Sequence, residues 1–139
     1  MYKFNYQKVS SIKEAEKLLN EDEEAKIIAG GQTLIPTMKQ RLASPSVLID
    51  IGGISDLNFI KEENDLIVIG ANTTHFEVAS SDLIKNKIPS LSDLAEGIGD
   101  PHVRNMGTIG GSISNNDPTA DYPAACLSLG AVIKTNKRD

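Results

Sequence analysis

The sequence predicts a fold of mixed helices and strands, with parallel strands near the N-terminus and an antiparallel hairpin after them. Helix and strand patterns alternate over about the first 50 residues, two apolar runs then flank a polar turn, and helical patterns follow. The composition is that of a globular chain, with 40% hydrophobic and 24% charged residues. A chain of 139 residues is also long enough to bury a core without disulfides.

The N-terminal part is expected to hold two parallel strands joined by a helix. Ser11 begins a capping-box pattern, which predicts a first helix with its apolar positions on one face. Short buried strands are predicted at 26–29 and 46–51. Thr33 is placed to cap a helix between them, and Pro36 falls in its first turn, where proline is tolerated. Strands connected by such a crossover helix run parallel.

The rest of the chain follows a different pattern. Runs at 57–61 and 66–69 flank the polar turn 62–65 and predict an antiparallel hairpin. Residues 97–121 form the least regular segment, and a loop of this length within a compact domain is usually functional. The remaining predicted elements are helices at 74–80, 90–96 and 122–129 and a strand at 131–134.

Charge and composition exclude several classes of function. The chain has 14 Lys and Arg against 19 Asp and Glu, a net charge of −5, and no Trp, whereas nucleic-acid binders carry basic excess and stacking aromatics. The single cysteine, Cys126, excludes an iron–sulfur cluster held within the chain, and no metal site is predicted. No apolar run could span a bilayer, and the first residues lack a secretory signal, so a cytoplasmic location is expected.

Adjacent glycines are the main chemical signal. A strand that runs into Gly30-Gly31 and then a helix offers unhindered backbone N–H groups and the positive end of a helix dipole to an anion. A second pair, Gly110-Gly111, is flanked by the hydroxyls of Thr108 and Ser112. The pair at 52–53 has no such polar cluster and is expected to be a simple turn.

These pairs lack the usual nucleotide-binding signatures. No glycine pair is followed by Lys, so a P-loop is disfavoured, and His102 stands where the dinucleotide fingerprint needs its last glycine. Backbone amides and hydroxyls, instead of Lys side chains, would have to hold a diphosphate. An isolated Gly-Gly is nevertheless a turn far more often than a ligand site, so residues alone leave both interpretations open.

Four segments together resemble a known family, the FAD-binding medium subunit of molybdenum hydroxylases. These enzymes are of the carbon monoxide dehydrogenase type, and the subunit is related to the flavin domain of xanthine dehydrogenase. The resemblance covers nearly the whole chain, with the motifs in order and at the expected spacing. The segments are 29–36 with the following Arg41-Leu42, 69–75, 100–112 and 117–121.

The resemblance implies an α+β fold of two FAD-binding subdomains, of the vanillyl-alcohol oxidase and carbon monoxide dehydrogenase flavoprotein type. Residues 1–55 would form the first subdomain and residues 56–139 an incomplete second one. The chain would therefore hold only the N-terminal part of the subunit, without the family's C-terminal domain.

The resemblance also implies which residues bind the cofactor, FAD, and that none is catalytic. Two loops would wrap the diphosphate with backbone amides. Ile98 and Gly99 would lie near the flavin ring or its linker, and Asp121 would accept a hydrogen bond from a sugar hydroxyl. Ser114 and Asn115 would contact other polar groups of the cofactor. The two loops comprise Ala29, Gly30, Gly31, Gln32, Thr33, Leu34, Ile35 and Pro36, and Thr108, Ile109, Gly110, Gly111 and Ser112.

In this family, electrons pass from a molybdopterin-binding large subunit through the [2Fe–2S] clusters of a small subunit to the flavin. The flavin then reduces an acceptor such as NAD or a quinone. Two alternatives stay open: a truncated, non-catalytic docking fragment, or half of a split flavin subunit. A stand-alone flavin reductase of the cell-wall precursor type would need a substrate domain that this sequence lacks.

Three other residues are expected to be structural. His75 could approach a flavin or an acceptor but is interpreted as a capping or structural histidine, and Cys126 is interpreted as a small buried apolar residue. Arg104 could face a diphosphate, but an ion pair or hydrogen bonds that fasten the loop are equally consistent with its position.

Overall fold

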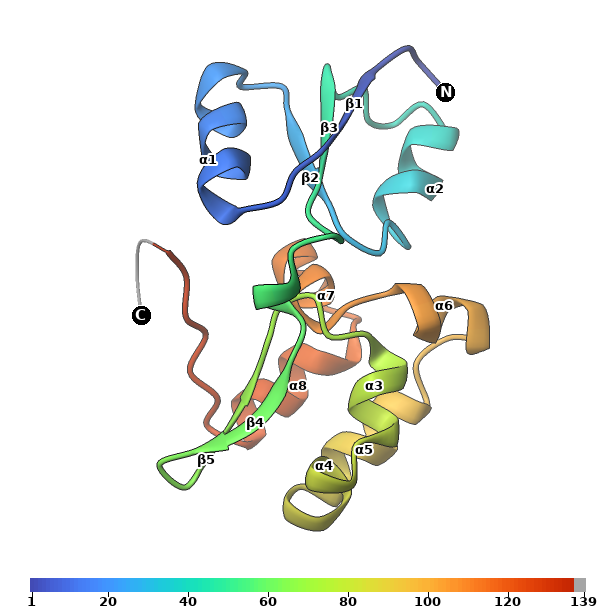
Figure 1. Ribbon diagram of the computed structural model, residues 1–139. Coiled ribbons are helices and arrows are strands. Elements are labelled where there is room, and N and C mark those ends of the chain that lie inside the picture. Colours follow the sequence, from blue (N-terminus) through green and yellow to red (C-terminus); the bar gives the residue numbers. More distant parts are fainter. Residues whose placement is uncertain (137–139) are drawn as a thin grey trace.

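The computed structural model describes residues 1–136, so the last three positions of the predicted second subdomain lie outside the described residues. The chain forms two groups of elements (Figure 1). A parallel sheet with two helices makes up the first, and a hairpin with six helices makes up the second among the described residues. This is an α+β arrangement, as predicted. No described helix has both the length and the apolar character needed to cross a membrane.

The first group is a three-stranded sheet with a helix on each side. Strand β3 is central and pairs in parallel with both neighbours. Its side chains alternate, so Ile49 packs under the helix α1 cluster while Leu48 packs with Met38 of α2 on the opposite face. The elements are β1 (Asn5–Lys8), α1 (Ile12–Glu21), β2 (Lys26–Ile28), α2 (Leu34–Lys39) and β3 (Val47–Asp50).

Strand β1 was not predicted, although α1, β2, α2 and β3 were. All four of its residues are exposed, so it carries no apolar pattern that sequence could report. It is held by backbone pairing to β3, and the Tyr6 hydroxyl donates to the Asp50 carboxylate. That hydrogen bond raises the pKa of Tyr6.

The second group begins with the predicted antiparallel hairpin, β4 (Ile60–Glu63) and β5 (Leu66–Ile69). Asn64 and Asp65 both have positive φ, 51° and 62°, as a two-residue turn requires. The first strand starts three residues later than predicted, because Ser55–Leu57 forms a short 3-10 helix.

Most predicted helices of the second group are confirmed. Helix α3 has a capping box between Thr74 and Glu77. The helices enclose one core cluster, which includes Val78, Ile84 and Tyr122. Helix α4 was missed, although the side chain of Ser81 caps it. The bounds are α3 (His75–Ser80), α4 (Asp82–Lys87), α5 (Pro89–Glu96) and α8 (Asp121–Ser128).

Two predictions of irregular and extended structure are wrong. The segment 97–121 contains α6 (Pro101–Met106) and α7 (Ile109–Asn115), because side-chain caps at Asp100 and Thr108 offset its high glycine content. Residues 131–134 form no strand. Apolar composition predicted that strand, but no described strand pairs with this segment, and Val132 is 73% exposed.

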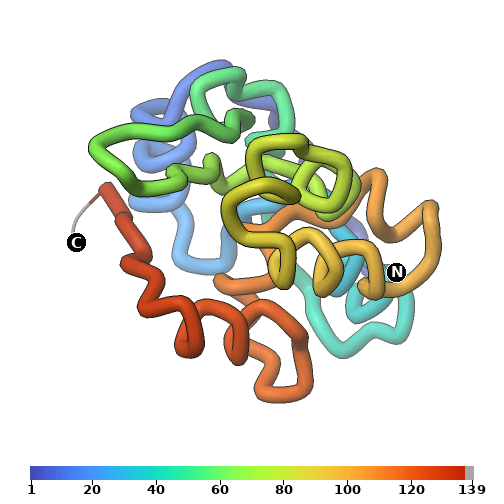
Figure 2. Tube along the Cα trace, turned by 90° about the horizontal axis from the view of Figure 1, so that it is seen from below, coloured from blue at the N-terminus to red at the C-terminus, as the bar shows by residue number. Residues whose placement is uncertain are grey.

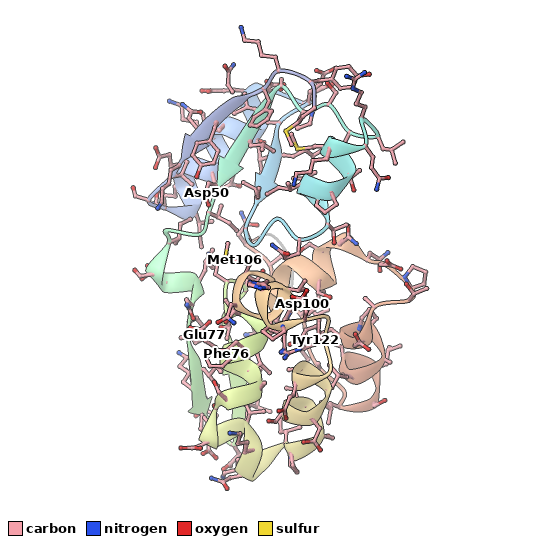
Figure 3. All side chains as sticks on the ribbon, turned by 90° about the vertical axis from the view of Figure 1, so that its right-hand side faces the viewer. Asp50, Phe76, Glu77, Asp100, Met106 and Tyr122 are labelled. Atoms are coloured by element: carbon pink, nitrogen blue, oxygen red, sulfur yellow. The ribbon has the colours of Figure 1, made fainter. Side chains whose placement is uncertain are left out.

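The two groups meet at a contact between backbones. A Cβ atom on Gly30 would lie 1.9 Å from the carbonyl oxygen of Met106 and 2.8 Å from Cα of Gly107. Figure 3 labels Met106 at this junction, and Figure 2 shows the orange chain there passing beside the blue and cyan chain of the first group. Asn72 reinforces the junction, because its Nδ2 donates to the Ile51 carbonyl at 2.7 Å.

Replacement of Gly30 by Ala should strongly destabilise the junction. The added Cβ meets backbone atoms, which cannot move aside as a flexible side chain could. We expect a loss of about 3 kcal/mol in the free energy of unfolding, the upper end of overpacking costs. Urea denaturation measures this loss.

Gly97→Ala is the matched control, because its Cβ would have only ordinary contacts, at 3.5 Å and beyond. Equal stability of the Gly30→Ala and Gly97→Ala variants would show that the junction is not closely packed.

Candidate functional site

A cleft of about 710 Å³ lies where the two groups meet. It is lined by the loop after β2 on one side and by α7, the start of α8 and residues 71–75 on the other. Most of the predicted site residues line it: Ala29, Gly30, Gly31, Gln32, Thr33, Leu34, Ile98, Thr108, Gly110, Gly111, Ser112, Ser114, Asn115 and Asp121.

Four residues of the predicted site do not line the cleft. Ile35 packs against the cluster of Ile28, Met38 and Leu48, and Ile109 belongs to the core of the second group. Gly99 has φ +52° in the turn before α6, and Pro36 lies in the first turn of α2. These four residues lie in the same segments as the lining residues and support the backbone there.

The loop after β2 offers a row of unpaired donors. Among the described residues, the backbone N–H groups of Gly31, Gln32, Thr33 and Leu34 have no acceptor. Gly31 has φ +69°, which turns the chain sharply at the end of the strand. Thr33 does occupy the position before α2, but it makes no capping hydrogen bond, contrary to the prediction, because its backbone is already helical. The unpaired N–H groups are therefore available to an acceptor in the cleft.

The second glycine pair is built differently. The N–H of Gly110 donates to the Ala71 carbonyl at 2.9 Å, and the N–H of Gly111 donates to Thr108 Oγ1 at 3.1 Å. A Cβ on Gly110 would lie 2.6 Å from the Ala71 carbonyl oxygen, so this glycine allows α7 to pack on residue 71. Free amide donors thus occur at the first pair. At the second, the available groups are side chains such as those of Ser112 and Ser114.

Charged groups in the cleft are few. Among the described residues that line the cleft, Lys26 is the only Lys or Arg, and Asp117 and Asp121 are the only carboxylates. Asp117 accepts from the N–H and the hydroxyl of Thr119, at 2.9 and 2.8 Å, and these hydrogen bonds lower its pKa. Asp121 stands exposed at the first position of α8. An anion in this cleft would therefore meet mainly uncharged donors, and a sugar hydroxyl would meet a carboxylate.

His75 and Asn72 line the cleft, although neither was among the predicted site residues. His75 is 5% exposed at the first position of α3, and its ring lies against that of Tyr122, with centroids 5.4 Å apart. Its Nε2 lies against Gly107, where an added Cβ would come within 2.6 Å. Burial lowers the pKa of His75. The polar run of residues 72–75 was the sequence signal that could have predicted them, because two residues of this run, Asn72 and His75, line the cleft.

The other residues that the sequence singled out lie outside the cleft. Arg104 fastens the loop before α6, because its Nη1 donates to the carbonyls of Ile98 and Gly99 at 3.2 and 3.0 Å. Cys126 is only partly buried, not fully buried as expected. Gly52 and Gly53 form a turn, as predicted.

Comparison with known proteins finds relatives over nearly the whole chain. Residues 2–139 match the family described as "FAD binding domain in molybdopterin dehydrogenase". The glyceraldehyde dehydrogenase medium chain of Sulfolobus acidocaldarius is 42% identical over 94% of this chain and 46% of its own length. The carbon monoxide dehydrogenase medium chain of Afipia carboxidovorans is 45% identical over 92% of this chain and 45% of its own.

Solved structures agree with these sequence matches. A carbon monoxide dehydrogenase from Hydrogenophaga pseudoflava, which lacks the Mo-pyranopterin moiety of its cofactor, superposes with a TM-score of 0.90 at 43% identity. The match covers 92% of this chain and 45% of that one. The chain therefore spans about half the length of the relatives it matches.

The lowered pKa of His75 predicts a loss of stability in mild acid. The unfolded chain takes up a proton near the ordinary pKa of 6.5, before the folded chain does. The stability that the uncharged His75 contributes is fully present above pH 6.5. It is lost as the pH falls from there toward the lowered pKa of His75 in the folded chain. Urea denaturation between pH 7.5 and 5.5 should show this fall, with a slope of at most about 1.4 kcal/mol per pH unit from one site.

The variant His75→Gln removes the titrating group, so its stability should depend less on pH over the same interval. An unchanged slope in this variant would assign the pH dependence to other groups.

Proposed function

The chain belongs to the family of FAD-binding domains of molybdopterin dehydrogenases, and on that premise we propose that FAD binds in the cleft between its two groups of elements. The observation that carries this proposal is the row of unpaired N–H groups at residues 31–34, inside a cleft of about 710 Å³. That volume lies within the usual range for small-molecule sites. The residues present thus fit a ligand that carries several acceptor oxygens.

The proposed contacts follow from the chemistry of each wall. The N–H groups of residues 31–34 would donate to the diphosphate, with the Ser112 hydroxyl on the facing wall. Asp121 would accept from a sugar hydroxyl, and Ile98 would supply apolar surface near the ring or its linker. Fixed, uncharged donors suit a diphosphate in an acidic protein, because they hold the ligand's charge without a matching cluster of lysines. We also propose residues 1–55 as the first FAD-binding subdomain and residues 56–139 as part of the second.

We further propose that the chain serves as the flavin-carrying electron-transfer component of a molybdenum hydroxylase. When bound, FAD would supply a redox centre between one-electron and two-electron carriers. The chain's own residues would bind and orient it and exclude water from the diphosphate. The relatives named as medium chains or subunits, one of them of a Cu,Mo-containing carbon monoxide dehydrogenase, support partnership with other subunits. We propose that these are a molybdopterin-binding large subunit and a [2Fe–2S] small subunit, with NAD or a quinone as acceptor. A cytoplasmic location stays a prediction.

The second candidate is half of a split flavin subunit, or a docking fragment without flavin. The observation that bears on it is apolar surface at the end of α8 and beyond, where Leu127 is 85% and Val132 73% exposed. The part of the relatives that this sequence does not match, in the same polypeptide or in a separate one, would cover such a surface. Recovery of that part as a separate polypeptide together with this chain would support a split subunit, and a complex without flavin would support a docking fragment.

FAD binding is the first test of the proposed function. Isothermal titration of the purified protein with FAD should give saturable binding. Gly111→Val should weaken it by tenfold or more, because Gly111 is exposed at the cleft and its Cβ would approach only Thr108 Oγ1, so the new side chain takes up ligand space.

Gly97→Val, on the surface at the end of α5, is the control and should bind FAD as the parent does. Equal affinity in all three proteins would place the diphosphate elsewhere.

The electron-transfer role predicts a defined metal content. A complex purified from native cells through a tag on this chain should contain molybdenum, iron and FAD, as metal analysis and absorbance would show. A flavin-containing preparation that carries neither metal would contradict the proposed partners.

A further inference from the structure

Two buried polar atoms lie on contacting side chains and have no hydrogen-bond partner. Among the described residues, His75 Nδ1 and the Tyr122 hydroxyl are both enclosed and unpaired. His75 is 5% exposed and Tyr122 fully buried, and they come from different helices, α3 and α8. Figure 3 places Tyr122 among the helices of the second group, below Met106. Buried polar atoms are nearly always paired in native proteins, so both require a partner.

The chemistry of the two side chains is complementary. Burial raises the pKa of Tyr122 far above its usual range, so the phenol keeps its proton and can donate. Burial lowers the pKa of His75, so at neutral pH the imidazole is uncharged, with one nitrogen as donor and the other as acceptor. The two rings are in contact, with centroids 5.4 Å apart and a tilt of 35°.

We propose that one enclosed water joins the two atoms, accepting a hydrogen bond from the Tyr122 hydroxyl and donating one to Nδ1 of His75, and thereby fixes the imidazole proton on Nε2 at the wall of the cleft. A phenol is a better donor than acceptor, and an unprotonated imidazole nitrogen is a strong acceptor, which sets the direction of both hydrogen bonds. Tyr122 is then a positioning residue, because it acts only through His75.

The position of Nε2 gives this water-mediated link a role in the cleft. Nε2 lies against Gly107. Gly107 in turn lies against Gly30, which immediately precedes the unpaired N–H groups of residues 31–34. His75 and Gly107 both line the cleft. If the proposed FAD site is correct, the Nε2–H group adds an uncharged donor to the cleft that the unpaired N–H groups of residues 31–34 also line. It would donate to an oxygen of bound FAD.

The imidazole tautomer can be measured without FAD. Long-range ¹H–¹⁵N spectra of the protein at pH 7.5 should show His75 protonated on Nε2 and accepting at Nδ1. The chain has two histidines, and the exposed His102 is the internal reference. Tyr122→Phe should remove this tautomer preference. Protonation of His75 on Nδ1, or an unchanged tautomer in Tyr122→Phe, would overturn the inference whether or not FAD binds.

Two matched variants test the role toward FAD. In His75→Gln the side-chain amide nitrogen overlays Nε2, and in His75→Asn it overlays Nδ1. We expect His75→Gln to bind FAD within about threefold of the parent and His75→Asn to bind about tenfold more weakly, the range for one hydrogen bond. Tyr122→Phe should lie between them. His102→Asn is the control and should bind as the parent does.

The outcomes separate the two proposals. Parent-like FAD binding by both His75 variants would overturn this inference and leave the FAD site intact. Absence of FAD binding by the parent would overturn the proposed function, while the tautomer still decides the water-mediated link between Tyr122 and His75. If His75→Asn fails to fold, as judged by circular dichroism, FAD affinity of Tyr122→Phe decides: a loss supports the inference and parent-like affinity overturns it.

Discussion

The close approach of Gly30 to the Met106 carbonyl is the contact on which the site depends. Two groups of elements with separate cores meet there through backbone atoms, with no room for a side chain between them. Asn72 adds a hydrogen bond across the same junction. The cleft lies beside this contact. The loop after β2 and the opposite wall, formed by α7 and the start of α8, therefore keep their separation only while the junction stays closed.

The two glycine pairs serve this cleft in different ways. The first leaves a row of backbone N–H groups unpaired, whereas in the second the N–H groups are bonded within the protein and the glycine provides close packing on Ala71. Because Lys26 is the only cationic side chain that lines the cleft in residues 1–136, fixed dipoles would hold most of a ligand's negative charge. This arrangement suits an acidic chain, since a ligand diphosphate does not have to be matched by buried lysines.

Local signals in the sequence predicted most of the fold. A capping box and apolar spacing placed α1, and apolar runs on either side of a polar turn placed the hairpin. The exposed strand β1 carried no pattern, and residues 131–134 lacked a partner strand. Motifs predicted most of the cleft lining, but they could not tell which amides were already paired. That depends on carbonyls such as that of Ala71, which only the tertiary fold brings near. For the same reason, the ring contact between His75 and Tyr122 left no sequence signal.

The most direct test of the account is a ¹H–¹⁵N spectrum of the protein during titration with FAD. The account predicts that the largest amide shifts fall on residues 31–34, whose N–H groups are unpaired. The amides of Gly110 and Gly111 should shift less, because they keep their partners within the protein. Saturating FAD that shifts amides away from the cleft, or none at all, would contradict the central claim.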